Sequence, residues 1–288
     1  MSLSTTVGHF WKLMPTPVRN LYHRMPIPIR RLINRAAFED KQQIVEVQTG
    51  LLKGSKLRLS PRSESGYYLG THEPDLQAGL PSFIKLGMTV FDVGANIGFF
   101  AVAAANLVGE NGKVVAFEPN PSVVARLKEN VELNGLADRV KIEQSAVGDF
   151  DGTAEFCFAL THLQGRFSDL PYVPQGSEST PVPCCKIDSY VASTKLVPDI
   201  VIMDVEHAEG RALRGMQSVL QRYKPLVFVE MHGPEAIREA FGEIVNADYR
   251  LFKLPAMDLV KEMNEIGLLS HLLAMPASTA KPVPDGAT

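Results

Sequence analysis

Residues 88–121 read MTVFDVGANIGFFAVAAANLVGENGKVVAFEPNP, and this stretch decides the fold. It predicts a buried strand over Thr89–Val93, a glycine-bounded turn over 94–98, an apolar helix, and a second strand over Lys113–Phe117. This order of elements is typical of the ligand-binding half of an open α/β sheet, in which ligands bind beyond the carboxyl ends of the strands. We therefore expect a binding site at the turn.

The residues of the turn indicate the kind of ligand. Gly94 lets the chain turn tightly off the first strand, and Gly98 lets the following helix approach that strand closely. A dinucleotide fingerprint, G-x-G-x-x-G, uses its second glycine to bring bare backbone against a pyrophosphate. Here Asn96 and Phe99 stand where its second and third glycines would be, and the sequence has no phosphate loop of the type G-x-x-x-x-G-K-[ST]. The turn therefore favours a ligand without phosphates and makes a nicotinamide dehydrogenase the weakest alternative.

Two acidic residues flank this turn. Glu118 ends the second strand, where its carboxylate can accept hydrogen bonds from both hydroxyls of a ribose, and Asp92 comes just before the turn. S-adenosylmethionine has a ribose, an ammonium group and a sulfonium, and it has no phosphate. We therefore predict S-adenosylmethionine as the cofactor.

Seven segments carry a resemblance to a known family. The turn resembles motif I of class I S-adenosylmethionine-dependent methyltransferases, and the ordered set resembles the FkbM family within that class. The set covers about residues 66–232, a majority of the chain. In chain order the segments are GYYLGTHEPDL (66–76), FDVGANIGFF (91–100), AFEPNP (116–121), LKENVELNGL (127–136), SAVGD (145–149), IVIMDVEHAEGRALRGM (200–216) and VFVEMH (227–232).

The resemblance implies roles for the cofactor-binding residues. In class I relatives the glycine turn lies against the methionine part of the cofactor, the acid after the second strand binds the ribose, and residues after the third strand lie beside the adenine. Glu73 is on a segment expected to close over the cofactor, and Asn120 is also expected to cap the following helix. Alternatively, Asp92 could only cap the turn, and Asn96 could bond its own backbone. The predicted cofactor-binding residues are Glu73, Asp92, Gly94, Asn96, Gly98, Glu118, Asn120, Ser145 and Ala146.

A second group of polar residues follows the predicted strand Ile200–Met203. Asp204 comes directly after this strand, so its carboxylate is expected to face the same crevice as Gly94. The family usually has D-V-E-G here, preceded by lysine, whereas this chain has His207 for the glycine and Met203 for the lysine. The histidine adds an imidazole that can act as a base near neutral pH.

Glu230 and His232 end the next predicted strand, so we expect them to converge with Asp204. Two carboxylates and a histidine suit Mg²⁺ or Mn²⁺, and a metal that bound an acceptor hydroxyl would lower its pKa. The alternative is a base or hydrogen-bond network without metal. Glu206 and Glu209 either join this site or only favour the dipole of the next helix. The predicted catalytic residues are Asp204, His207 and His232, and the candidate metal ligands are Asp204, Glu230 and His232.

The rest of the chain adds appendages to one large domain. With 288 residues, 45 % of them hydrophobic, the chain can bury a sizeable core. We predict a basic helical arm over 1–40, a methyltransferase domain with a leading hairpin over 41–275, and a disordered tail over 276–288. Residues 159–181, rich in Gly, Ser and Pro, are predicted to form a loop.

The charge pattern bears on partners and location. Residues 1–37 contain six basic residues and no acid, and this arm either contacts an anionic membrane surface or packs on the acidic body or a second subunit of a homo-oligomer. The net charge of −3 gives no reason to expect nucleic acid, and three cysteines form no disulfide framework. No stretch reaches the roughly 20 apolar residues of a membrane helix, and no secretory signal opens the sequence, so we expect a cytoplasmic protein.

These features predict an α/β fold with a Rossmann-like, seven-stranded, mostly parallel sheet, helices on both faces, and an N-terminal helical and hairpin extension. The predicted function is O-methylation of a hydroxyl on a small or medium organic acceptor, such as a sugar or a polyketide-type metabolite. N-methylation is one alternative, in which loss of Asp204 or the histidines should matter less. A non-catalytic scaffold that binds S-adenosylmethionine is another, which a blocked crevice at Asp204 would favour.

Overall fold

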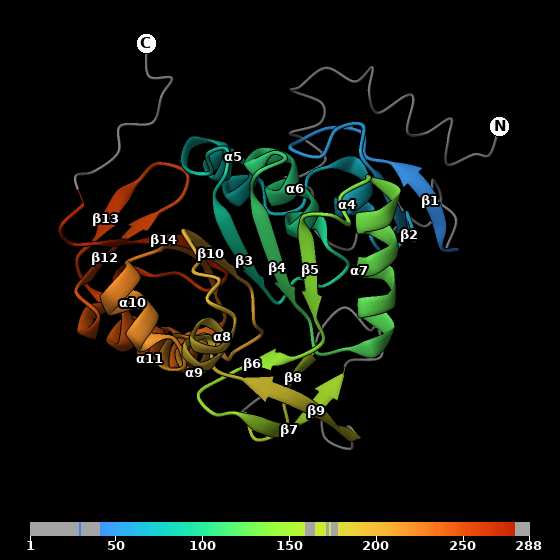
Figure 1. Cartoon of the computed structure of the whole chain (residues 1–288). Helices are drawn as coiled ribbons and strands as arrows, with labels where there is room; N and C mark the ends of the chain where they lie inside the picture. Colours follow the sequence, from blue (N-terminus) through green and yellow to red (C-terminus); the bar gives the residue numbers. More distant parts are fainter. Residues whose placement is uncertain (1–28, 30–40, 159–164, 171–172, 174–177, 280–288) are drawn as a thin grey trace, which may run out of the picture.

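The computed structural model describes residues 41–158, 165–170, 173 and 178–279, together with Ile29. A large twisted sheet crosses the molecule, with helices on both of its faces and a second, smaller sheet below its edge in Figure 1. The large sheet has the strand order β13-β12-β14-β11-β10-β3-β4-β5. Its parallel half consists of β3 (Thr89–Val93), β4 (Lys113–Phe117), β5 (Val140–Glu143), β10 (Ile200–Met203) and β11 (Leu226–Met231).

The parallel half confirms the predicted Rossmann-like core. All four residues of β10 are buried, as are the last four of β3, because helices cover both faces. Successive residues of one strand point to opposite faces of the sheet, and each face has its own hydrophobic core. Val90 belongs to the core with α5, α6 and α7, whereas Phe91 belongs to the core with α8, α9, α10 and α11. The helices are α4 (Ser65–Leu69), α5 (Pro74–Phe83), α6 (Phe99–Val108), α7 (Pro121–Leu133), α8 (Ile187–Thr194), α9 (Glu209–Arg214), α10 (Gln217–Tyr223), α11 (Gly233–Asn246) and the 3₁₀ turn η1 (Met263–Glu265).

The other half of the sheet is antiparallel and corrects the predicted number of strands. The large sheet has eight strands rather than seven, because β14 inserts between β11 and β12 and β13 pairs with the far edge of β12. A short apolar run such as the one in β14 cannot be assigned from its periodicity alone, and its partner β11 is distant in the sequence. These strands are β12 (Tyr249–Lys253), β13 (Asp258–Val260) and β14 (Ser270–Pro276).

The second sheet was only partly predicted. Its order is β6-β9-β7-β8, and the alternating residues of Thr153–Phe158 predict a strand only for β7. The prediction of a loop over 159–181 is wrong at 165–167 and 179–181, which are strand residues; 159–164, 171–172 and 174–177 lie outside the described residues. Pairing with β7 holds both segments in the sheet despite their Gly, Ser and Pro content. The four strands are β6 (Ala146–Val147), β7 (Gly152–Phe158), β8 (Gly165–Phe167) and β9 (Ser179–Cys185).

The appendages are described in part. The predicted hairpin is confirmed: β1 (Gln43–Glu46) and β2 (Lys56–Leu59) pair antiparallel beside α7. The predicted arm, 1–40, lies outside the described residues except for Ile29, and of the tail only 276–279 are described. Pro276 is still part of β14. Across the described part of the chain, no helix combines the length and apolar content needed to cross a membrane.

Candidate functional site

A cavity of about 660 Å³, open to solvent, lies at the carboxyl ends of β3, β4 and β10. One wall is formed by the glycine turn and the residues after β4, and the opposite wall by β7 and β8 of the second sheet. The lining residues used below are Gly94, Asn96, Glu118, Asn120, Ser145, Ala146, Phe156, Phe158, Arg166, Phe167, Asp204 and Glu206.

The glycine turn fits tightly between two strands. Gly94 has φ +87°, and a Cβ at this position would lie 1.8 Å from the carbonyl oxygen of Asp204. The N–H groups of Gly94 and Ala95 donate to the carbonyl oxygen of Phe117 at 3.0 and 2.9 Å. Only glycine fits between the ends of β4 and β10, so the turn presents bare backbone to the cavity.

Glu118 organises the same wall. Its Oε2 accepts the N–H of Asn96 at 3.0 Å and its Oε1 accepts the N–H of Asn120 at 2.8 Å. Burial raises the pKa of Glu118 to about 7, although these two N–H groups favour the charged form. The side chain of Asn120 accepts the N–H of Ser122 at 3.0 Å, which confirms Asn120 as the cap of α7. Each carboxylate oxygen has a second lone pair, so Glu118 can also accept from ribose hydroxyls.

Three of the predicted cofactor-binding residues do not line the described cavity: Glu73, Asp92 and Gly98. A Cβ on Gly98 would lie 2.4 Å from Leu127 Cδ1, so this glycine makes room for α7. Asp92 is 3 % exposed, and its Oδ2 has no hydrogen-bond partner among the described residues. Burial, then the charges of Glu73 and Glu118, raise the pKa of Asp92 to about 8. A cationic ligand group beside Asp92 would relieve that cost.

Asp204 connects the cavity to a buried histidine. Burial and the charges of Glu73 and Glu230 raise the pKa of Asp204 well above its ordinary range, and its Oδ1 has no hydrogen-bond partner within the described part of the chain. The Nε2 atom of His232 lies 3.6 Å from this Oδ1. A carboxylate with a raised pKa at the edge of a cavity is a candidate general base.

His232 is held from its other side by Glu209. Nδ1 of His232 lies 2.5 Å from Oε1 of Glu209, whose side chain is fully buried at the start of α9. Burial opposes the imidazolium charge, but the bond to Glu209 and the charges of Asp204 and Glu206 outweigh it and raise the pKa of His232 to about 9. His232 is therefore a cation near neutral pH. The ring of His207 lies 5.9 Å from it, centroid to centroid, and His207 has φ +67°.

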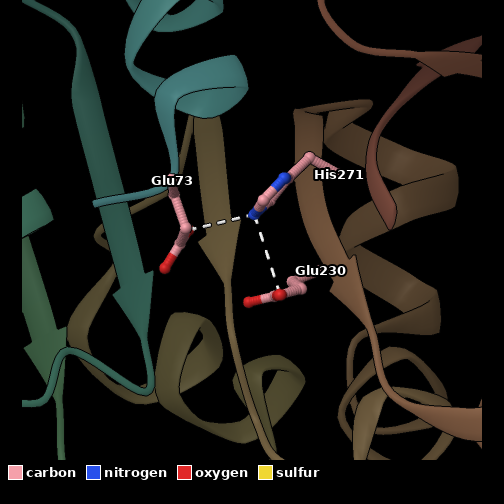
Figure 2. A group of neighbouring side chains, drawn as sticks. All are labelled: Glu73, Glu230 and His271. Carbon is pink, nitrogen blue, oxygen red and sulfur yellow. Dashed lines mark ion pairs between the residues drawn. The ribbon is translucent and has the colours of Figure 1, made fainter. Parts of the chain in front are cut away.

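A third histidine joins this network from the antiparallel half of the sheet. His271 of β14 is directly opposite Glu230 of β11 in the strand register. Its Nε2 lies 3.4 Å from Oε2 of Glu73 and 3.8 Å from Oε1 of Glu230. Figure 2 draws these two ion pairs as dashed lines. Burial opposes the charge on Glu73, but His271 and His72 outweigh it and hold the pKa of Glu73 at about 2; Nε2 of His72 is 2.6 Å from Glu73 Oε1.

Among the residues that the structure describes, two groups of three could each hold a cation. Asp204, Glu230 and His232, predicted from the sequence, offer ligand atoms that lie within 4.8 Å of one another. Glu73, Glu230 and His271 form a second group within the same limit. The sequence did not indicate His271, because residues 255–275 contain no motif and β14 reaches Glu230 only through sheet pairing.

The second sheet supplies residues that the sequence analysis missed. Phe156, Phe158 and Phe167 give the cavity an aromatic wall, and Arg166 pairs with Glu206 across it at 3.8 Å. The alternation of aromatic residues in β7 was a usable signal for this wall. The sequence carries no comparable signal for Arg166, because this residue stands in the Gly-, Ser- and Pro-rich stretch that predicts a loop.

A glycine turn between parallel strands, a carboxylate ending the second strand and a cavity beyond both define the class of Rossmann-like, S-adenosylmethionine-dependent methyltransferases. The model of the methyltransferase FkbM domain matches residues 92–251, more than half of the chain. The chain belongs to the FkbM methyltransferase family.

Individual relatives match at lower coverage. The chain is 27 % identical to 31-O-demethyl-FK506 methyltransferase FkbM of Streptomyces tacrolimicus over 190 residues, covering 56 % of this chain and 71 % of that protein. It is 30 % identical to ribosomal protein L11 methyltransferase of Carboxydothermus hydrogenoformans over 124 residues, 42 % of this chain but only 35 % of that protein. The solved structure of methyltransferase FkbM from Methylobacillus flagellatus is 14 % identical with a TM-score of 0.44, covering 65 % of this chain and 43 % of that one.

Proposed function

We propose that this protein transfers a methyl group from S-adenosylmethionine to a hydroxyl of a small or medium organic acceptor. The observation that carries the proposal is the position of Asp204. It lines the same cavity as Gly94 and Glu118 and has a pKa raised well above its ordinary range. A general base is needed for a hydroxyl nucleophile, and such a group works best with a pKa near the operating pH.

The residues present fit the cofactor. Gly94 keeps the turn free of a side chain, Glu118 has lone pairs for ribose hydroxyls, and the buried Asp92 suits a positive charge. When bound, S-adenosylmethionine supplies a methyl group on a sulfonium, so the leaving group is neutral. Ser145 and Ala146 would flank the adenine, as the family resemblance implies. The task left to the protein is to hold the two reactants in line and to accept the proton of the acceptor.

Asp204 would accept that proton, with His232 as its positioning partner. The imidazolium of His232, fixed by Glu209, stabilises the negative charge of Asp204 before proton transfer and is not itself available as a base near neutral pH. The ring of His207 lies 5.9 Å from that of His232, and His207 does not line the described cavity. We therefore assign the base to Asp204 among the three predicted catalytic residues.

The acceptor class rests on the cavity wall and on one relative. Phe156, Phe158 and Phe167 suit an apolar ring or chain, and the cavity is open at Asp204, which favours an enzyme over a blocked scaffold. The Streptomyces relative is named as a methyltransferase acting on 31-O-demethyl-FK506. A polyketide-type hydroxyl, or the hydroxyl of a sugar, is the acceptor that we propose. N-methylation is the second candidate.

We also propose a site for a metal ion, a location and an association state. A Mg²⁺ or Mn²⁺ ion held by Asp204, Glu230 and His232 would need the neutral imidazole of His232 and would polarise the acceptor hydroxyl. We propose that the protein is cytoplasmic and that it associates into a homo-oligomer. The basic arm, which precedes the described domain, would make any membrane contact.

Calorimetric titration with S-adenosylhomocysteine and, separately, with NAD tests the cofactor, each with and without Mg²⁺. We expect binding of S-adenosylhomocysteine alone. Binding of NAD, or of neither compound, would refute the proposal.

A radiolabelled methyl donor and a panel of hydroxyl acceptors with their amine counterparts test the reaction. O-methylation predicts product from the hydroxyl member of a pair, and loss of that product in Asp204→Asn. Product from amines alone, with Asp204→Asn still active, would favour N-methylation instead.

A further inference from the structure

We propose that Glu73, Glu230 and His271 form a binding site for a divalent cation of the Mg²⁺ and Mn²⁺ class. The three side chains come from the loop before α5, from β11 and from β14, and all three point toward one spot in Figure 2. Carboxylates and imidazole nitrogen are ligands that both ions accept.

The distances suit ligands that share an ion better than direct pairs. Nε2 of His271 lies 3.4 Å from Glu73 Oε2 and 3.8 Å from Glu230 Oε1. Two ligands that are each about 2.1 Å from one ion are about 3.0 Å apart at a right angle and about 4.2 Å apart across the ion. Charge-assisted hydrogen bonds between these groups would be about 2.7–2.9 Å long.

Burial supplies a second, independent observation. The side chain of Glu73 is only 8 % exposed, and across the described residues its Oε2 and His271 Nε2 have no contact beyond their long ion pairs, with no hydrogen bond of normal geometry. Buried polar atoms without partners are rare because each costs about 1–3 kcal/mol. A cation between them would satisfy both atoms at once.

The surroundings hold the carboxylate in place. Oε1 of Glu73 is bound by His72, and the amide of Gln77 donates to the carbonyl oxygens of Gly70 and His72 in the same loop. Glu73 itself has φ +42°, a left-handed backbone conformation that non-glycine residues adopt rarely and often at functional sites. Outer partners of this kind fix the direction of a metal ligand.

Glu230 links the proposed cation site to the neighbouring pair of Asp204 and His232. Its Oε1 faces His271, whereas its Oε2 lies 3.7 Å from His232 Nε2. Glu73, Glu230 and His271 do not line the described cavity, so the cation would lie beside the base rather than in that cavity, and any role in methyl transfer rests on the proposed function. The binding of the cation does not.

The test is Mn²⁺ binding to the chelator-treated full chain, followed by electron paramagnetic resonance of free and bound Mn²⁺. We expect saturable binding whose affinity falls at least tenfold in His271→Ala and in Glu73→Gln. We also expect a ¹⁴N modulation of the bound ion that disappears in His271→Ala. Glu262→Gln, an exposed acid elsewhere on the surface, is the matched control and should bind as the wild type does.

His232→Ala separates the two candidate cation positions. The proposal predicts less than a threefold change in Mn²⁺ affinity for this variant. It is overturned if Mn²⁺ does not bind, or if His232→Ala weakens binding as much as His271→Ala. Circular dichroism and urea unfolding of each variant show that the fold is intact, because Glu73 is itself a predicted cofactor-binding residue. If S-adenosylhomocysteine binds and Mn²⁺ does not, only the cation site fails; if S-adenosylhomocysteine does not bind, the proposed function fails.

Discussion

The backbone of Asp204 closes the space beside Gly94 so completely that no side chain fits there. A Cβ on Gly94 would lie 1.8 Å from the Asp204 carbonyl oxygen. The turn that is expected to hold the cofactor and the strand end that carries the proposed base are thus in direct contact. A change at one must displace the other.

The first prediction concerns Gly94→Ala. The added methyl group must move β10 and must also adopt φ +87°, so we expect a loss of at least about 2 kcal/mol in the free energy of unfolding and loss of S-adenosylhomocysteine binding. Gly54→Ala is a matched control, because Gly54 has φ +89° with no heavy atom within 4 Å of its Cβ position. It should cost about 1 kcal/mol and leave binding intact. Equal effects in denaturant unfolding would refute the steric argument.

The second prediction concerns Asp204→Asn. The amide cannot accept the acceptor proton, so turnover should fall at least about 100-fold, the lower end of general base catalysis, while cofactor affinity stays within about threefold. For the wild type, kcat/KM should rise with pH through an apparent pKa above the ordinary range of aspartate, because only the deprotonated form is a base. A variant with normal turnover, or a flat pH profile in the wild type, would remove Asp204 from this role.

The third prediction concerns Glu118→Gln. Replacing the carboxylate removes charged hydrogen bonds, so S-adenosylhomocysteine affinity should fall by about 1–3 kcal/mol in calorimetry. Because Glu118 also accepts the N–H groups of Asn96 and Asn120, circular dichroism should accompany each titration. Glu110→Gln, at an exposed acid before β4, serves as the control. Unchanged affinity in Glu118→Gln would exclude Glu118 from the cofactor site.

The fourth prediction is a pH dependence of stability due to Asp92. Its pKa is about 8 in the fold but about 3.9 in an unfolded chain, so the folded protein binds more protons between these values. The contribution of this group to stability is therefore fully present below about pH 4 and is lost as the pH rises to about 8. Asp92→Asn should make the unligated protein more stable than the wild type at pH 8, by at least about 1 kcal/mol, with a smaller difference at pH 5.

Urea unfolding at both pH values measures this effect, with Asp258→Asn at an exposed strand position as control. An Asp92→Asn variant that is less stable at pH 8 would show that the Asp92 carboxylate is charged and well paired in the fold.

The fifth prediction concerns the histidine beside the base. The bond from Glu209 helps to raise the pKa of His232 to about 9, so Glu209→Gln should lower this pKa by at least about 1 unit in a nuclear magnetic resonance titration. Glu235→Gln, an exposed acid in the first turn of α11, should leave it unchanged. If both variants titrate like the wild type, Glu209 does not control the charge of His232.

Much of the fold could be predicted because its signals are local. The strand, turn and helix around Gly94 follow from an apolar run, two glycines and a second apolar run, and the acid at Glu118 follows from its place after a strand. Asp204 lines one cavity with Gly94, as its place directly after a strand predicts, and Asn96 and Glu118 line the same cavity. Local signals fail where pairing between distant strands decides the structure. The composition around β8 predicts a loop, and no local pattern indicates β14.

The sequence by itself therefore determined the Rossmann-like core, the family and the cofactor-binding edge, since each depends on residues close together in the chain. The order of the strands also predicted that Asp204, Glu230 and His232 converge, but only the tertiary structure decided that Glu73 and His271 join Glu230. Glu73, Glu230 and His271 are separated by long stretches of sequence. They come together because β14 pairs antiparallel with β11 and because Glu73, in the loop before α5, reaches His271. Such contacts depend on sheet register and burial, which no local pattern encodes.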